Sequence, residues 1–202
     1  GIISFQLRHG LKGDGIVGNE TLEKMNIPLE AKIATIRLNM ERMRWMSEEM
    51  ENRYIEVNVP AFMLGVVEEG EERLTMRAIT GRPERPTPIF NAKMTYLVVN
   101  PYWRVPETIL REDIFPKVRK NIRYLKKERI RIFRHGDQGG KMAISPASIN
   151  WHKANPNTFP FYLRQEPGPK NALGRIKFMF PNTHDIYIHD TPDKRLFAQT
   201  KR

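Results

Sequence analysis

Beyond Asn52 the hydrophobic period of the chain changes from helical to two residues, and this change restricts the fold more than any other feature of the sequence. In YIEVNVP, residues 54–60, apolar side chains alternate with Glu56 and Asn58. The segment RLTMRAIT, residues 73–80, repeats the pattern after an acidic EEGEE turn. A period of two places alternate side chains on one face of a strand. We predict two consecutive strands of a sheet with one solvated face.

Further strands are predicted along the rest of the chain. The almost fully apolar segment TYLVVNP, residues 95–101, is typical of a strand in the middle of a sheet, where both faces are buried. The segments FYLRQ (161–165), RIKFMF (175–180) and IYIHD (186–190) predict later strands. The expected fold class is mainly β with a helical insertion (α+β), preceded by a helical connector.

The N-terminal part is predicted to be helical. Residues 1–28 have the pattern of a helix end, a glycine-rich turn and a second short helix, with Gly10 ending the first. Residues 29–50 then predict a connecting helix with one buried apolar stripe. The residues at helical spacing are Ile33, Ile36, Met40 and Met43.

Positive charge is concentrated in residues 104–134, where 11 lysines and arginines face 4 acidic residues, giving +7 of the total net charge of +11. Apolar residues keep helical spacing there, so we predict an inserted helical subdomain with a basic outer face. That face is either simply solvated or binds an anion. Nucleic acid is not the expected partner, because Tyr124 and Phe133 fall within patterns that indicate burial instead of exposed stacking platforms.

A histidine at the end of the last strand is the main candidate for chemistry. Alternation in DIYIHD places Asp185, Tyr187 and His189 on one face. His189 is suited to act as a general base, because the imidazole pKa lies near physiological pH; a structural histidine is the alternative.

A metal site is the other chemistry that this segment suggests, since His184, Asp185, His189 and Asp190 are all ligand types. Strand alternation puts His184 and His189 on opposite faces, so we expect neither a metal nor another cofactor.

The 202 residues contain no cysteine, which excludes disulfides and thiolate ligands within them. No apolar run approaches the roughly 18 residues of a membrane span, and the first ten residues lack the order of a signal peptide. We therefore expect either a cytoplasmic protein or one whose targeting segment has been removed.

Five ordered stretches resemble the L,D-transpeptidase catalytic domain of bacterial cell-wall enzymes, in particular the Gram-negative subgroup with a helical capping insertion. They are VNVPAFML, GRPERPTP, VVNPYWRVP followed by DIFPKVR, QEPGPKNALGRIKFMFPN and IYIHDTPDKRLF, within residues 54–197. The opening FQLRHGLKGDGIVGNETLEKMN is similar to the second half of a peptidoglycan-binding helical module.

The resemblance implies a β-sandwich fold with a capping subdomain and cysteine acyl transfer. In this family a cysteine thiolate attacks the carbonyl that links diaminopimelate to the terminal D-alanine of a tetrapeptide stem. The side-chain amine of a neighbouring stem then resolves the thioester into a 3→3 crosslink. Peptidoglycan stem peptides and glycan are the implied partners, carbapenem-type β-lactams are plausible inhibitors, and the periplasm or cell envelope is the implied location.

The resemblance also assigns roles to single residues. His189 matches the base histidine, and Asp190 and Thr191 stand where the family often has Gly-Thr at the rim of the site. Tyr187 lies beside His189 on the same strand. Trp103 and the insertion that begins at Arg104 would roof the substrate groove. Gly174 and Arg175 match a segment close to the groove, and all of these except His189 are expected to bind substrate.

One family feature is not found in these residues. The family nucleophile lies in a Ser-x-Gly-Cys motif a short loop after the base histidine, and the printed sequence ends at Arg202 before such a motif. We therefore expect the printed chain to be inactive in acyl transfer, with a non-catalytic peptidoglycan-binding protein as the alternative. The expected domains are a partial peptidoglycan-binding-like module (1–28), a connecting helix (29–50) and a catalytic domain (51–202) truncated at its C-terminus, with the capping insertion at about 104–150.

Overall fold

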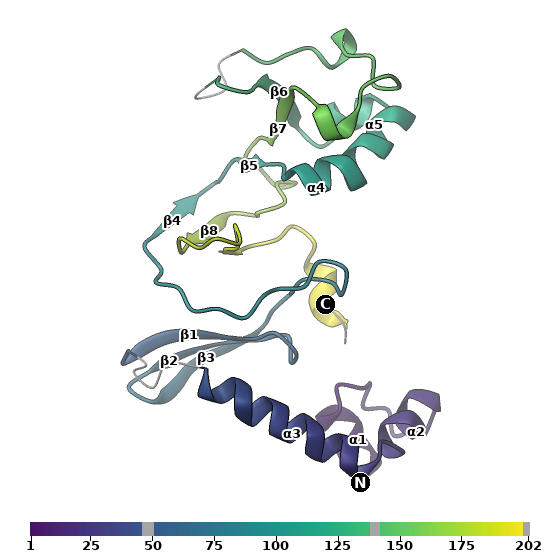
Figure 1. The fold of residues 1–202 in the computed structure, drawn as a ribbon, viewed down its shortest axis with the longest axis vertical. Helices are drawn as coiled ribbons and strands as arrows, with labels where there is room; N and C mark the ends of the chain where they lie inside the picture. Colours follow the sequence, from purple (N-terminus) through teal and green to yellow (C-terminus); the bar gives the residue numbers. More distant parts are fainter. Residues whose placement is uncertain (46–50, 138–141, 200–202) are drawn as a thin grey trace. The chain divides into compact units, whose positions relative to one another are not determined.

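The computed structural model describes residues 1–45, 51–137 and 142–199, which form two compact units. One unit contains residues 1–87 with 195–202, and the other contains Pro88–Lys194. Figure 1 shows the fold and labels α1–α5 and β1–β8. Residues 46–50 of the expected connecting helix, 138–141 of the expected insertion and 200–202 lie outside the described residues.

The first two helices, α1 (Ile2–Arg8) and α2 (Asn19–Met25), flank a turn built around a buried glutamine. Gln6 is 1% exposed, and its Oε1 accepts a hydrogen bond from the backbone N–H of Gly15 at 2.8 Å. Gly10 follows α1 with a φ of 68°, which favours glycine because it lacks a Cβ. The predicted helix, turn and helix are confirmed.

The long helix α3 (Leu29–Arg44) forms where helical spacing predicts it, but none of its residues is buried. The expected buried stripe is therefore wrong for the described residues, since Ile33 is 41% and Met43 is 69% exposed. Spacing determines which side chains share a helix face. Burial also needs a surface that covers this face, and the spacing carries no information about it.

An antiparallel meander completes this unit, with strands β1 (Arg53–Asn58), β2 (Met63–Glu68) and β3 (Glu71–Arg77) in that order. The sequence prediction made β1 and β3 consecutive and missed β2 between them. The pairing of β2 with β3 shifts register between Val66 and Val67. The extra residue at this shift is Arg73 of β3. β2 itself, MLGVVE, has neighbouring apolar residues without a period of two, so the search for alternation did not detect it.

In the second unit, one antiparallel sheet has the order β4 (Tyr96–Val99), β8 (Ile176–Met179) and β9 (Ile188–His189). The apolar strand β4 was expected in the middle of a sheet, and this is wrong for the described residues, because β8 holds the central place. Leu97 of β4 is 55% exposed. An apolar run thus identified a strand without indicating its number of neighbours.

A second antiparallel sheet has the order β5 (Trp103–Arg104), β7 (Phe161–Gln165) and β6 (Ile130–Arg134). Between β5 and β6 the chain forms the predicted helices. Their bounds are α4 (Glu107–Ile109), the π-helical turn η1 (Leu110–Ile114), α5 (Phe115–Lys120) and α6 (Arg123–Lys127). Short 3-10 turns follow later, η2 (Pro146–Ser148), η3 (Pro156–Thr158) and η4 (Lys194–Ala198). Antiparallel sheets with separate helices give the predicted α+β class.

The helices and the β6–β7 pair of the insertion enclose one hydrophobic core. Its buried residues are Val105, Leu110, Ile114, Phe115, Val118, Leu125, Ile130, Ile132, Trp151 and Leu163. Of the four residues at helical spacing in the insertion, Ile114, Val118 and Leu125 are buried, as the spacing predicts, whereas Ile122 is 38% exposed. Residues 130–134 were expected in the helical subdomain but form β6, because alternate side chains of this segment enter the core.

Candidate functional site

His189 is the second residue of β9 and pairs with Lys177 of β8 in the antiparallel register. The preceding turn is held by Asn182, whose Nδ2 donates to the carbonyl of Ile186 at 2.7 Å. Asp185 has a φ of 53°, so the predicted alternation from Asp185 to His189 is wrong at its first residue. Side-chain hydrogen bonds in the turn, more than strand length, therefore fix where His189 lies.

The hydrogen bonding of His189 fixes which of its nitrogens can act as a base. Nδ1 is within hydrogen-bond distance of the backbone carbonyl of Asp190, which can only accept. Nδ1 therefore carries the proton in the neutral ring, and Nε2 keeps its lone pair. His189 is exposed by surface area, yet the atoms packed around its ring make desolvation the largest influence on its pKa, which desolvation lowers. Asp190 opposes this effect, and the charge of Lys177 lowers the pKa further. The net pKa lies below the ordinary 6.5, so the ring is a neutral base at pH 7.

Tyr187 and Lys177 stand beside the histidine. The ring centroids of Tyr187 and His189 are 5.7 Å apart, and Nζ of Lys177 lies 3.6 Å from the centroid of Tyr187. Burial raises the pKa of Tyr187, so its phenol is neutral at pH 7, and burial lowers the pKa of Lys177. Sequence reasoning missed Lys177, although a lysine between Ile176 and Phe178 in an apolar strand is a visible signal.

A carboxylate fastens the segment after His189 to the loop before β8. Oδ2 of Asp190 accepts from the backbone N–H of Arg175 at 3.0 Å, and Oδ1 pairs with Nζ of Lys194. Desolvation raises the pKa of Asp190, but the hydrogen bonds from Lys194, Arg175 and Thr191 lower it by more, so it lies below 3.8. Asp190 is therefore ionised and stabilises this loop as an anion.

Gly174 leaves space for that carboxylate. A Cβ added at Gly174 would lie 2.4 Å from Oδ2 of Asp190, and the residue has a φ of 62°. Both facts require glycine here. Gly174 and the backbone of Arg175 therefore hold Asp190, and the substrate-binding role that the resemblance implies for them stays a prediction.

The remaining predicted residues lie in two places. Thr191 follows Asp190, and its Oγ1 accepts from the backbone N–H of Asp193 at 3.2 Å. Trp103 belongs to the other sheet, where it pairs with Gln165 and packs partly buried against the core of the insertion. The structure thus gathers Gly174, Arg175, Tyr187, His189, Asp190 and Thr191 around β8 and β9, with Trp103 on a different sheet.

Two buried amides that the sequence reading did not single out, Gln165 and Asn171, connect these parts. Nδ2 of Asn171 donates to the carbonyl of Pro101 at 2.9 Å, and its Oδ1 accepts from the backbone N–H of Leu173 at 2.8 Å. Nε2 of Gln165 donates to the carbonyl of Glu128 at 3.0 Å, next to α6. A buried side-chain amide is destabilising unless its polar atoms form hydrogen bonds such as these. Together they tie β5, β7 and α6 to the loop that carries Gly174.

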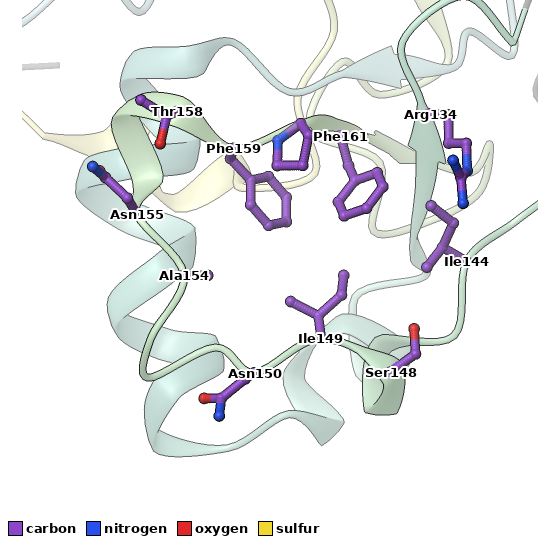
Figure 2. Close-up of a pocket in the computed structure, with 11 residues that line it drawn as sticks. Arg134, Ile144, Ser148, Ile149, Asn150, Ala154, Asn155, Thr158, Phe159 and Phe161 are labelled. Carbon is purple, nitrogen blue, oxygen red and sulfur yellow. The ribbon is translucent and has the colours of Figure 1, made fainter.

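A hollow of about 430 Å³ lies beside β6 and β7, and its lining residues are drawn in Figure 2. The rings of Phe159 and Phe161 and the side chain of Ile149 point into it, and Arg134 stands at its rim. Its lining residues are Arg134, Ile144, Ser148, Ile149, Asn150, Ala154, Asn155, Thr158, Phe159, Pro160 and Phe161, and they include no residue of the His189 cluster. Phe159 also packs edge-on against Phe115 at 5.0 Å, so the hollow is an unfilled margin of the insertion core.

Metal and membrane features were sought in the same described residues. In residues 1–45, 51–137 and 142–199, no group of three or more His, Asp or Glu side chains is placed to hold a metal ion. Within these ranges no helix combines the length and apolarity needed to cross a membrane.

The arrangement can accept a proton at Nε2 of His189 and return it to a nearby leaving group. Nδ1 stays bonded to the Asp190 carbonyl throughout, so the ring keeps its orientation as its charge changes. A positive charge at Lys177 lies next to this base. A nucleophile that needs activation by a base would complete the chemistry, and the printed residues contain no thiol.

Comparison with known proteins adds two findings. Residues 52–202 match the family described as "YkuD: L,D-transpeptidase catalytic domain". The chain is also 34% identical over 167 residues to a protein of Haemophilus influenzae (strain ATCC 51907 / DSM 11121 / KW20 / Rd) named "Putative L,D-transpeptidase". That alignment covers 83% of this chain and 32% of the relative, so the chain spans about a third of the relative's length.

Proposed function

Because the chain belongs to the L,D-transpeptidase catalytic domain family, we propose that it is part of a peptidoglycan L,D-transpeptidase that forms 3→3 crosslinks. The substrates are tetrapeptide stems of the cell wall, and the site of action is the periplasm or cell envelope. The tautomer of His189, fixed by the Asp190 carbonyl, is the observation that carries this proposal.

In the proposed reaction, Nε2 of His189 takes the proton of the attacking thiol. The thiolate forms a thioester with the diaminopimelate carbonyl, the bond to D-alanine breaks, and the protonated histidine returns its proton to the leaving amine. An amine of a neighbouring stem then displaces the thiolate, giving its proton to His189. Such a base typically contributes about 10²–10⁴-fold to a rate.

The thiol is the part of this mechanism that the 202 residues do not contain. We propose that a polypeptide of only this sequence binds stem peptides but does not transfer acyl groups. A cysteine of the Ser-x-Gly-Cys type would have to be supplied by the natural protein. The same cysteine would be the group that a carbapenem-type β-lactam acylates.

Three parts of the chain take separate roles in the proposal. Residues 1–28 form part of a peptidoglycan-binding module, residues 29–50 connect it, and residues 51–202 form the catalytic domain with a cap at about 104–150. The buried Gln6 supports the first assignment, because it rigidifies the turn that such a module would present.

The test compares two histidine variants of the natural protein that contains these residues. His189→Gln should lower the rate of D-alanine release from a tetrapeptide by about 10²–10⁴-fold. His184→Gln is the matched control, since His184 packs against Phe90 with ring centroids 5.3 Å apart and should keep the rate. A His189→Gln protein that crosslinks at the wild-type rate would overturn the mechanism.

A non-catalytic peptidoglycan-binding protein is the second candidate, in which the same groove binds glycan or stem peptide without turnover. The two candidates differ in one observation. Retention of the natural protein on cell-wall sacculi without D-alanine release or new 3→3 crosslinks would support the binding protein, whereas turnover would exclude it.

A further inference from the structure

We propose that Lys177 binds the terminal carboxylate of the D-alanine that leaves from the donor stem. This assignment rests on the proposed function and names a recognition point within it. It gives a role to a charged residue of the site that neither the family match nor the sequence pattern assigned.

The position of Lys177 follows from the β8–β9 register. Lys177 and His189 are direct partners in an antiparallel pair, so their side chains project from the same face of the sheet. Nζ lies over the ring of Tyr187, 3.6 Å from its centroid, and that ring lies beside the His189 ring. The ammonium group and the ring of the base therefore both lie against the ring of Tyr187.

The charge of Lys177 has no carboxylate partner within 4.0 Å among the described residues, in contrast to Lys194, which pairs with Asp190. Lys177 is also half-buried, and desolvation lowers its pKa while the more distant Asp185 raises it. A partly desolvated cation without a counter-ion is unfavourable in the free protein. An anionic ligand relieves this cost, so the site favours a carboxylate at this point.

The geometry selects which carboxylate of the stem this is. The terminal carboxylate of D-alanine is separated from the scissile amide nitrogen by a single carbon. Since Nε2 of His189 must reach that nitrogen, a carboxylate one carbon away falls near the side-chain ammonium of its cross-strand partner. Carboxylates further along the stem lie several bonds from the scissile amide. Lys177 would therefore distinguish a free D-alanine terminus from a blocked one.

The experiment measures binding to the 202-residue chain, which contains no thiol and cannot consume the ligand. Two probes are titrated in an NMR or calorimetric experiment, a diaminopimelate tetrapeptide with a free D-alanine carboxylate and the same peptide with a terminal carboxamide. Wild-type chain should bind the free acid about tenfold more tightly than the amide. Lys177→Met should bind both probes equally, with the affinity that wild type shows for the amide.

Two controls separate this role from general charge and from folding. Lys32→Met removes the same charge from the exposed face of α3 and should leave the tenfold preference unchanged. Lys177→Arg should retain part of the preference. Methionine keeps an unbranched side chain over Tyr187, and an unchanged amide spectrum outside β8 and β9 verifies the fold.

The possible outcomes are distinct. A Lys177→Met chain that still prefers the free acid tenfold overturns the assignment of Lys177 and leaves the proposed function intact. Wild-type chain that binds neither peptide overturns the proposed function and, with it, this assignment. Loss of the preference in Lys177→Met, with Lys32→Met unchanged, supports both.

Discussion

Replacing Asn171 with alanine should destabilise the second unit more than any exposed asparagine does. Asn171 is 1% exposed and makes three side-chain hydrogen bonds. The substitution leaves the carbonyl of Pro101 and the N–H of Leu173 buried without these partners. Each such group costs about 1–3 kcal/mol, so the expected loss is about 2–6 kcal/mol. The third bond, to the carbonyl of Glu166, adds less because that group is only part-buried.

The assay is urea unfolding followed by tryptophan fluorescence. Trp45 lies in the first unit and is changed to Phe, so that Trp103 and Trp151 report on the second unit alone. Asn155→Ala is the control, because its exposed side chain accepts a single bond, from the N–H of Asn157 at 2.9 Å. We expect the free energy of unfolding of Asn155→Ala to fall by about 0.5–1 kcal/mol.

A second variant tests whether the donor or the acceptor of Asn171 matters. Asn171→Asp keeps an oxygen for the N–H of Leu173 but turns an acceptor toward the carbonyl of Pro101. Asn171→Asp should lower the free energy of unfolding by at least as much as Asn171→Ala does. The reasoning is refuted if Asn171→Ala is no more destabilising than Asn155→Ala, or if Asn171→Asp is as stable as wild type.

Two further expectations follow from the same region. Gly174→Ala should lower the free energy of unfolding by about 1–3 kcal/mol more than Gly136→Ala in the same assay, because both glycines have positive φ but only the Cβ at position 174 meets Asp190. Equal losses would contradict the close approach. The pKa of His189 is lower in the folded state than in the unfolded chain, so the unfolded chain binds the proton more tightly. The stability that the neutral ring contributes is therefore complete above about pH 6.5. It is lost as the pH falls below that value. His189→Gln should therefore flatten the loss of stability between pH 7 and pH 5, and an unchanged pH profile would show that the ring is not desolvated.

The predictions that succeeded depended on local spacing. Helical spacing located α3 and the insertion helices, and alternation located β1, β3, β7 and β8. Pairing and burial are decided by contacts distant in sequence, and most predictions about them failed, although Ile114, Val118 and Leu125 of the insertion are buried as expected. The apolar strand β4 is at an edge, the stripe of α3 is exposed, and β2 was missed because its sequence does not alternate.

In the candidate site, too, local sequence identified residues but not the contacts between distant segments. His189 was identified because the end of its strand is a recognisable motif, and the resemblance added Gly174, Arg175, Asp190 and Thr191. No local pattern shows that Asp190 accepts from Arg175, 15 residues away, or that Asn171 donates to Pro101, 70 residues away. The position of Lys177 opposite His189 is known only from the β8–β9 register.

The insertion begins and ends at one point of the scaffold. The chain leaves through β5 and returns through β7, and Trp103 and Arg104 pair directly with Gln165 and Arg164. Between these two crossings the chain encloses a hydrophobic core of its own. A segment with adjacent ends and its own core can be exchanged while the β5–β7 pair is kept, with β6 leaving as part of the segment. A protein engineer could therefore replace it with a short hairpin or with a cap of different charge.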